Sequence, residues 1–299
     1  MLRENFNDLT YFIVVAREQS FTRAAARLGV SQSALSHAIR SLEQRLNMRL
    51  LTRTTRSVST TEAGEQLVKN ITPLIDDLES VLQSLNDEQG RIVGNLRITV
   101  GEHALRSALL PKASAFIAQY PEVNIEFVSD NSLTNIVSER FDAGVRLGDQ
   151  IEKDMIALRI GPDWRMTVVA APEYFATWGK PDTPYALPQH NCINMRLPTL
   201  GGLYQWEFID QGKEIRVRVA GQLTFNNLLS RIDAAVAGLG VIYAPEDSVA
   251  ELVAQGTLEP VLEEWCEYFT GYHLYYPSRK QHTAAFSKFI DAVRYQASS

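Results

Sequence analysis

The sequence predicts an α/β protein with a small all-α module at its start, one long helix after it, and a two-lobed α/β region. Three observations predict this architecture. Apolar residues recur at helical spacing through residues 6–46 around a single glycine turn. A regular leucine-rich seam then occupies residues 67–85. Strand and helix patterns alternate from residue 96 onward, which is typical of sheets covered by helices.

The composition is that of a folded protein, and one segment of the chain is basic although the net charge is negative. The chain has 299 residues, 45% of them hydrophobic and 21% charged, which is enough for two or three domains with substantial cores. The net charge is −6, but residues 17–60 contain eight arginines and two acids, a net charge of +6, so the remainder carries −12. A basic stretch inside an acidic chain is the electrostatic pattern of a nucleic-acid-binding surface.

Residues 20–46 read as two helices joined by a tight turn. Ser20 or Thr22 caps the first helix, Gly29 ends it, and Ser31 caps the second. One face of the second helix is apolar, and the other carries hydrogen-bonding groups, namely Gln32, Ser33, Ser36, His37 and Arg40. A helix, a glycine turn and a helix with a polar outer face match the helix-turn-helix plan, in which the second helix enters the DNA major groove.

The flanking segments complete this module. Residues 6–16 form a first helix that backs the other two. Residues 47–61 are rich in threonine and arginine, and we interpret them as a β-wing whose Arg53 and Arg56 meet the phosphate backbone or the minor groove. The alternative, a solvated basic hairpin, is weakened by its position next to the helix-turn-helix.

A long helix begins after Thr60 or Thr61. Its apolar residues fall at intervals of 4, 3, 4, 3 and 4, at Leu67, Ile71, Leu74, Leu78, Val81 and Leu85. So narrow a stripe on a long helix predicts pairing with a second copy of the chain. The competing interpretation, one side of an intramolecular bundle, is less favoured because polar residues flank the stripe on both sides.

The remaining chain predicts two α/β lobes. The first contains strands at 96–100, 123–128 and 141–148 with helices at 108–120 and 133–140, so we expect a parallel sheet. A second run begins at 166–170, with strands at 191–195, 206–209, 215–219 and 222–225 and a helix at 228–237. The last strand, 272–276, and the last helix, 282–295, resemble the first run, so the chain returns to the first lobe. A cleft between such lobes suits a small ligand.

The sequence gives little support for a metal-binding protein, a secreted solute-binding protein or an enzyme. Cys192 and Cys266 form no metal-ligand pattern, and we expect two reduced thiols. No signal peptide or membrane-span-length segment is present, so we expect a soluble cytoplasmic protein and not a secreted solute-binding protein. The sequence contains no P-loop, no GxSxG motif and no HExxH motif, and its five histidines are scattered. We therefore expect neither an enzyme nor a cofactor.

These motifs together resemble the LysR-type transcriptional regulators over the whole chain. The resemblance is carried by residues 21–25, 28–32, 35–36 and 42–43, then by Arg53, Arg56, Thr61, Ala63 and Gly64, with weaker matches at Pro121, 142–148 and 238–240. Departures at Ser33, Leu51 and Thr60 are mild. The resemblance implies a winged helix-turn-helix, a dimerising linker helix and a periplasmic-binding-protein-like effector domain. It also implies a homotetramer built as a dimer of dimers.

The implied domains are 1–60 for DNA binding, 61–90 for the linker and 91–299 for the effector, with lobe I at 91–162 and 268–299 and lobe II at 163–267. The implied partners are double-stranded DNA, a second copy of the chain and a small-molecule effector, with RNA polymerase as a further candidate. The expected DNA-binding residues are Thr22, Arg23, Ser31, Gln32, Ser33, Ser36, His37, Arg40, Arg53 and Arg56. Among them Gln32 can pair bidentately with adenine, which is worth ~1–3 kcal/mol of base discrimination.

The resemblance places the effector site in loops between the lobes. The expected residues are Gly101, Glu102, His103, Asn131, Ser132, Gly148, Asn194, Met195, Arg196, Phe225 and Asn226. Relatives often have Ser or Thr where Glu102 stands, so one hypothesis is a neutral or cationic effector, unless His103, Arg106 or Arg196 offsets that charge. The equally weighted alternative is that Glu102 merely caps its own helix.

Overall fold

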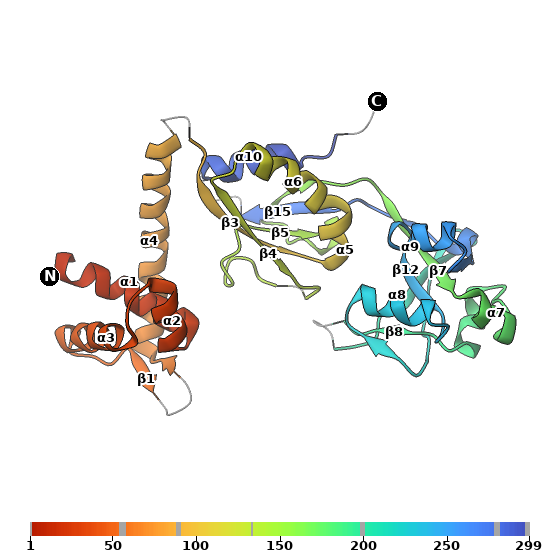
Figure 1. Cartoon of the computed structure of the whole chain (residues 1–299), viewed down its shortest axis with the longest axis horizontal. Coiled ribbons are helices and arrows are strands. Elements are labelled where there is room, and N and C mark those ends of the chain that lie inside the picture. Colours follow the sequence, from red (N-terminus) through yellow and green to blue (C-terminus); the bar gives the residue numbers. More distant parts are fainter. Residues whose placement is uncertain are drawn as a thin grey trace. The chain divides into compact units, whose positions relative to one another are not determined.

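A computed structural model describes residues 2–53, 58–87, 91–132, 134–197, 201–277 and 282–296. The chain divides into two compact units, Met1–Leu85 and Asn86–Ser299 (Figure 1). Among the helices of the described ranges, none combines the length and the apolar character that crossing a bilayer requires.

The first unit is a three-helix module with a small hairpin and a long helix. Its elements are α1 (Leu2–Glu18), α2 (Phe21–Leu28), α3 (Gln32–Leu46), β1 (Leu51–Arg53), β2 (Val58–Thr60) and α4 (Glu62–Asp87). β1 and β2 pair antiparallel, as the predicted wing requires. The core is formed by apolar side chains that all three short helices and β1 contribute, including Phe12, Ala24, Leu35, Ile39, Leu42 and Leu51.

Local capping fixes the turn between α2 and α3. The Ser20 hydroxyl, and not that of Thr22, accepts a hydrogen bond from the Arg23 amide at 3.4 Å, so Ser20 caps α2. Gly29 then ends α2 with φ of 66°, a left-handed conformation that glycine adopts without steric cost. The Ser31 hydroxyl accepts from the Ala34 amide at 3.1 Å and starts α3.

The wing is tied to the helices through one carboxylate and one glycine. The Glu43 Oε1 atom accepts hydrogen bonds from the amides of Leu50 at 2.8 Å and Leu51 at 3.1 Å. At Gly64 in α4, a Cβ atom would lie 2.1 Å from the Leu50 carbonyl oxygen, so only glycine lets the helix pass this close to the wing. The Thr61 hydroxyl accepts from the Gly64 amide at 3.1 Å and caps α4.

The two halves of the apolar seam of α4 lie in different environments. Leu67 and Ile71 pack against the core of their own three-helix module, which corrects the expectation that the whole seam faces a second copy. Leu74 and Leu78 are 62% and 43% exposed, respectively. The side chains of Val81 and Leu85 lie outside the described residues. In Figure 1 the carboxyl-terminal half of α4 projects away from the three short helices.

Lobe I, defined here by a five-stranded sheet and its helices, contains both ends of the second unit. Its strands are β3 (Gly94–Val100), β4 (Val123–Ser129), β5 (Ala143–Arg146), β6 (Met155–Arg159) and β15 (His273–Pro277), in the order β4-β3-β5-β15-β6. β3 is parallel to β4 and β5, whereas β15 is antiparallel to β5 and β6, so the sheet is mixed and not wholly parallel as expected.

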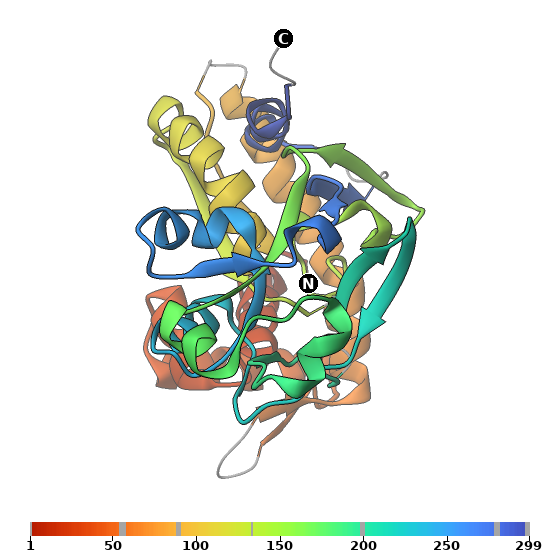
Figure 2. The ribbon, with the colours of Figure 1, turned by 90° about the vertical axis from the view of Figure 1, so that its right-hand side faces the viewer.

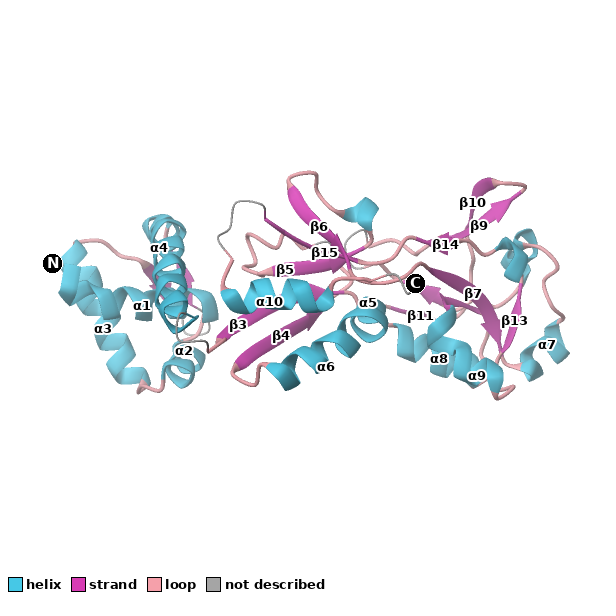
Figure 3. Cartoon of the chain, turned by 90° about the horizontal axis from the view of Figure 1, so that it is seen from above, coloured by secondary structure: helices cyan, strands magenta, loops and turns pink. Residues whose placement is uncertain are grey.

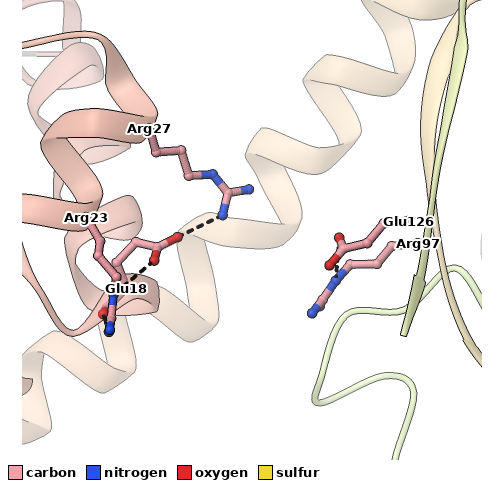
Figure 4. A network of polar contacts seen from close by, with 5 residues as sticks. All are labelled: Glu18, Arg23, Arg27, Arg97 and Glu126. Atoms are coloured by element: carbon pink, nitrogen blue, oxygen red, sulfur yellow. Dashed lines mark hydrogen bonds and ion pairs between the residues drawn. The ribbon is translucent and has the colours of Figure 1, made fainter. Parts of the chain in front are cut away.

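Helices cover one face of this sheet. They are α5 (Glu102–Ala104), which continues through a π-helical turn (Leu105–Leu109) into α6 (Leu110–Gln119), and α10 (Ala284–Val293). α6 and α10 lie side by side over the strands (Figure 3), where Phe116 and Phe289 pack edge to face. Across β3 and β4, Arg97 Nε donates to Glu126 Oε2 at 3.0 Å, an exposed cross-strand pair (Figure 4).

The helix expected over residues 133–140 was a wrong prediction. Residue 133 is outside the described ranges, and residues 136–140 form turns. Asn135 explains the difference, because its Oδ1 atom accepts from the amides of Val137 and Ser138, both at 3.0 Å. Such short polar side chains compete with helical hydrogen bonding. Arg140 closes the segment with φ of 59°.

Lobe II, defined by the sheet around β7 (Trp164–Ala170), is built from the middle of the unit. β12 (Ile242–Pro245), β13 (Glu259–Val261) and β14 (Tyr268–Phe269) pair antiparallel with β7. α8 (Leu228–Val236) and α9 (Glu246–Ala254) share a core with one face of β7. The hairpin of β9 (Trp206–Asp210) and β10 (Lys213–Val217), teal arrows in Figure 2, packs with α7 (Pro172–Trp178) in the opposite core. β8 (Asn194–Met195) pairs parallel with β11 (Thr224–Phe225).

Two segments connect the lobes and run against each other. The chain leaves lobe I after β6 and returns through β15, and the Ile160 amide donates to the Tyr272 carbonyl oxygen at 2.8 Å where the segments meet. A Cβ atom at Gly271 would lie 2.1 Å from the Gly161 carbonyl oxygen. The absence of a side chain at Gly271 therefore allows the two connections to pass in contact.

Candidate functional site

The outer face of α3 is exposed and polar. Gln32, Ser33, His37 and Arg40 are exposed and Ser36 is half-buried. On the opposite face Leu35, Ile39 and Leu42 have no solvent exposure. The helix is therefore anchored by one ridge of side chains while the other ridge remains available to a ligand.

Neighbouring polar groups order the amino-terminal end of this face. The Thr22 hydroxyl, on α2, donates to Gln32 Oε1 at 3.4 Å. The hydroxyls of Ser31 and Ser33 are 3.0 Å apart, and Arg40 Nη2 donates to the Ser36 hydroxyl at 3.3 Å. Thr22 of α2 and Gln32 of α3 thus lie side by side at the start of the exposed face of α3.

Most of the acids near this surface are engaged by arginines or amides. Glu18 accepts from Arg27 Nη1 at 2.9 Å and lies 3.6 Å from Arg23 Nε (Figure 4), while Asp8 pairs with Arg45. Glu43 is occupied by the wing amides described above. Within residues 20–50, two exposed arginines have no ion-pair partner among the described residues, namely Arg40 and Arg49. Arg49 was not expected, although it belongs to the same arginine-rich segment.

The wing arginines are only partly described. Arg53 ends β1, in register with Val58 of β2. Its side chain, and the whole of Arg56, lie outside the described residues. Their proposed contacts therefore rest on the sequence.

A cavity of about 170 Å³ lies between the two lobes. Lobe I and its connection contribute Glu102, His103, Asn131 and Tyr272. Lobe II contributes Trp164, Met166, Met195, Leu197, Tyr204, Leu228, Arg231 and Pro245. Apolar walls with a few convergent polar groups are typical of small-molecule sites, and this volume suits a molecule with few heavy atoms.

Two side chains at the start of α5 reach across to lobe II. Glu102 Oε2 accepts a hydrogen bond from the Leu228 amide, the first of α8, at 2.8 Å. His103 Nε2 lies 2.8 Å from Asp247 Oδ1 on α9, and its Nδ1 lies 2.8 Å from the Tyr272 hydroxyl. With the proton on Nε2, the imidazole donates to Asp247 and accepts from Tyr272. Glu102 therefore caps a helix of the opposite lobe, not its own helix.

The electrostatics of Asp247 reflect this contact. Burial raises the pKa of the Asp247 carboxyl, but the hydrogen bond and charge of His103, together with bonds from Ser248, outweigh burial and hold the pKa below its usual value. The contacts that Asp247 makes with His103 and Ser248 thus favour its ionised carboxylate.

Aromatic rings form one wall of the cavity. Trp164 stacks on Phe269 with ring centroids 5.1 Å apart and on Tyr272 with centroids 5.4 Å apart. The His103 ring lies against the same indole, 4.7 Å away. The Trp164 Nε1 atom is buried without a hydrogen-bond partner among the described residues.

Arg231 is a buried cation at the other side of the cavity. Its side chain is on α8, the residue is 3% exposed, and Nη1 donates to the Tyr243 carbonyl oxygen at 3.0 Å. Burial lowers the pKa of this guanidinium to about 10, and the nearby charge of Glu102 opposes that shift. The sequence did contain a signal, because Arg231 falls on the apolar face of α8 that Leu228 and Ile232 define.

A second buried arginine positions the loop after β4. Arg146 is 6% exposed, and its Nη2 donates to the carbonyl oxygens of Asp130 at 3.0 Å and Ser132 at 2.7 Å. These bonds hold the residues on either side of Asn131, which lines the cavity. Asn131 Oδ1 in turn accepts from the Glu102 amide at 3.3 Å.

Four of the expected effector residues line the cavity, namely Glu102, His103, Asn131 and Met195. The other seven expected effector residues are not among the residues that line the cavity. Gly101 precedes α5, Ser132 bonds back to Asp130, Gly148 packs on the His273 ring, Asn194 is buried in β8, Arg196 donates to the Gly201 carbonyl, Phe225 lies in β11, and Asn226 is exposed. The lining residues that the sequence did not single out come mostly from lobe II.

Comparison with known families agrees with both regions. Residues 6–65 match the bacterial regulatory helix-turn-helix model of the lysR family, and residues 89–298 match the LysR substrate binding domain. The chain belongs to the LysR family. It is a transcriptional regulator with a DNA-binding helix-turn-helix and an effector-binding domain.

Relatives of this LysR-family regulator align over nearly their whole length. The transcriptional regulator PgrR of Escherichia coli is 49% identical, and the match covers 99% of both chains. PtxR of Pseudomonas aeruginosa is 33% identical over 97% of this chain and 92% of its own length. The full-length structure of the Vibrio cholerae virulence activator AphB is 27% identical with a TM-score of 0.67, covering 96% of this chain and 97% of that one.

Proposed function

We propose that this LysR-family regulator reads DNA sequence through the exposed face of α3 and that a small effector in the interlobe cavity controls it. One observation carries the first part most directly. The polar residues of α3 are exposed along one face while Leu35, Ile39 and Leu42 are fully buried along the other. A helix anchored in this way can enter a major groove without losing its own packing.

Within this proposal the surface residues divide into two roles. Gln32, Ser33, Ser36 and His37 contact base edges, because they lie on the exposed face and have donors and acceptors of suitable reach. Phosphate contacts come from Thr22, Arg23, Ser31 and Arg40, from Arg53 and Arg56 of the wing, and from Arg49 as an addition. Phosphate contacts orient the protein, whereas base contacts provide specificity.

We further propose that the protein acts as a dimer, and as a dimer of dimers, through the outer half of α4. The exposed apolar side chains of Leu74 and Leu78 support this pairing. The corresponding division of the chain is 1–60 for DNA binding, 61–90 for the linker, and 91–299 for the effector. Lobe II runs from 163 to 269, two residues beyond the boundary expected from the sequence, because β14 pairs with β7. RNA polymerase is the further partner we propose, and the cytoplasm, where bacterial DNA is transcribed, is the proposed location.

The proposed effector site is the cavity that Glu102, His103 and Asn131 share with lobe II. A ligand there would alter the hydrogen bonds that Glu102 and His103 make across the cleft, so lobe closure and binding are coupled. We propose a sensing role and no catalytic one, which agrees with relatives that are themselves regulators of transcription.

Selection of binding sites from random duplexes tests the proposal. The full chain should enrich a sequence with two-fold symmetry and half-sites about one or more helical turns apart. A genome-wide binding map should place the same sequence upstream of genes. Enrichment of no sequence over several rounds, with folded protein, would refute sequence-specific reading by α3.

A further inference from the structure

A carboxylate from lobe I, that of Glu102, lies at the amino end of α8 in lobe II. Helix amino termini attract anions, since their first amides are unbonded and the helix dipole is positive there. In α8 the Ser230 amide donates to Asn227 Oδ1 at 2.8 Å, which is ordinary capping. The Leu228 amide instead donates to Glu102 Oε2 at 2.8 Å, from 126 residues earlier in the chain.

Arg231 adds an independent reason for an anion at this position. It lies one helical turn beyond Leu228, lines the same cavity and is 3% exposed. Its Nη1 atom bonds only a neutral carbonyl, and its Nε atom is buried with no partner among the described residues. A buried guanidinium without a carboxylate in hydrogen-bond contact attracts negative charge strongly.

We infer that Glu102 is a built-in occupant of an anion-binding site formed by the Leu228 amide and Arg231. The side chain stands where the carboxylate of a ligand would bind, and its hydrogen bond to the Leu228 amide joins the two lobes. The effector of this regulator therefore does not anchor a carboxylate at α8. It presents a hydrogen-bond donor, such as an ammonium or amide group, to Glu102. The inference rests on the proposed effector cleft only for its regulatory meaning.

The simpler view treats Glu102 as a helix cap and nothing more. Under that view, loss of the carboxylate weakens the protein and creates no affinity for anions. Under our inference, loss of the carboxylate exposes a site with a preference for small carboxylates. The two views thus differ in a gain of binding, which mere destabilisation cannot imitate.

Thermal unfolding of the full chain in sodium acetate, against sodium chloride at equal ionic strength, provides the test. For Glu102→Ala we expect an acetate-specific, saturable rise in Tm of roughly 3–6 °C at acetate concentrations about tenfold above Kd. Wild type should show none. Glu102→Gln should also show none, because its amide oxygen still accepts from Leu228. Glu173→Ala, which removes an exposed acid from the first turn of α7, is the matched control and should show none.

Several results would overturn the inference. They are an acetate-specific shift in wild type as large as in Glu102→Ala, no acetate-specific shift in Glu102→Ala, and an equal gain in Glu173→Ala. If Glu102→Ala does not fold, Glu102→Ser leaves the position equally open, and the same gain is required of it. The measurement on the wild-type protein can overturn the inference even if neither variant folds.

DNA binding separates this inference from the proposed function. Where acetate binds Glu102→Ala but leaves its DNA affinity unchanged, the anion site stands and control through the cleft fails. Where acetate does not bind but the protein still selects a DNA sequence, the inference fails and DNA reading by α3 stands.

Discussion

The helix-turn-helix surface and the interlobe cleft are built in contrasting ways. The surface of α2 and α3 comes from 27 consecutive residues, 20–46, and most of its polar side chains are exposed to water. The nearby acid Glu18 pairs with Arg23 and Arg27. The cleft draws residues from 102 to 272, and it buries a cation, Arg231. The first region can act through exposed charge, whereas the second acts through the geometry of buried hydrogen bonds.

This difference predicts how each region responds to change. Exposed arginines interact with DNA through counterion release, so their effects depend on salt and are modest one at a time. Buried polar groups depend on their partners, so loss of one partner is costly and local. Variants of the two regions should therefore differ in the size, the salt dependence and the pH dependence of their effects.

The largest effect should come from the buried ridge of α3. Leu35→Ala removes a fully buried side chain, and we expect a loss of ~2–5 kcal/mol in unfolding free energy. Amide hydrogen exchange should show the loss in α1 to α3 and not in lobe I. The matched variant Phe116→Leu, at a buried site in lobe I, should show the reverse. Equal loss of protection in both units after either change would mean that the regions are not energetically distinct.

A smaller effect is expected from the exposed arginines. Arg40→Ala should weaken binding to all duplexes and reduce the slope of log K against log salt by roughly 0.9. Arg23→Ala should reduce the slope less, because Glu18 already neutralises part of the Arg23 charge. Binding titrations at four salt concentrations measure both slopes, with Arg216→Ala on β10 as the control. Identical slopes for Arg40→Ala and wild type would remove Arg40 from the phosphate contacts.

A pH-dependent effect should be confined to the cleft. The folded-state pKa of Asp247 lies below its ordinary value, so the stabilisation is present above about pH 4 and is lost as the pH falls through the lower folded value. Asp247 is half-exposed, so solvent screens part of this contribution. Asp247→Asn should flatten the fall in Tm between pH 5 and pH 3, whereas Asp182→Asn, at an exposed site, should keep the wild-type profile. Superimposable profiles for all three proteins would exclude the His103–Asp247 contact as a source of stability.

The smallest response is expected from the thiols. Burial raises the pKa of Cys192 and that of Cys266 to about 12, so neither is a thiolate near neutral pH. A thiol-reactive dye should label neither residue in the native protein at pH 8 and both in denaturant. Rapid labelling of one equivalent in native protein would contradict this and would assign a reactive thiol to lobe II.

The contrast also explains what the sequence could predict. The helix-turn-helix depends on short-range signals, such as Ser20, Gly29 and Ser31, and each has a local physical cause visible in the sequence. The turn at Asn135 was missed because its side chain competes with helix formation in a way that apolar spacing does not reveal. The packing of Leu67 and Ile71 on their own module was missed for a related reason, because periodicity shows a stripe but not its partner.

The sequence predicted mainly those residues of the cleft that belong to lobe I. Glu102, His103 and Asn131 follow strands of lobe I, and the ends of neighbouring strands meet at one edge of a sheet. Their partners Leu228 and Asp247, and the nearby cation Arg231, lie more than 90 residues later, in lobe II, and are close only because the two lobes meet at the cleft. No local spacing indicates such contacts, although a charged residue on the apolar face of α8 could have drawn attention to Arg231.

Sequence discrimination by α3 is measured by the ratio of its affinities for a specific and for a random duplex. A duplex selected by the wild-type chain and a random duplex of equal length are titrated with wild type, Gln32→Ala and Gln44→Ala, the last an exposed residue near the carboxyl end of the same helix. We predict that Gln32→Ala lowers the ratio of specific to random affinity by at least roughly fivefold, the lower end of one lost bidentate contact, while Gln44→Ala leaves the ratio unchanged. An unchanged ratio for Gln32→Ala, together with an unchanged selected sequence, would contradict the account.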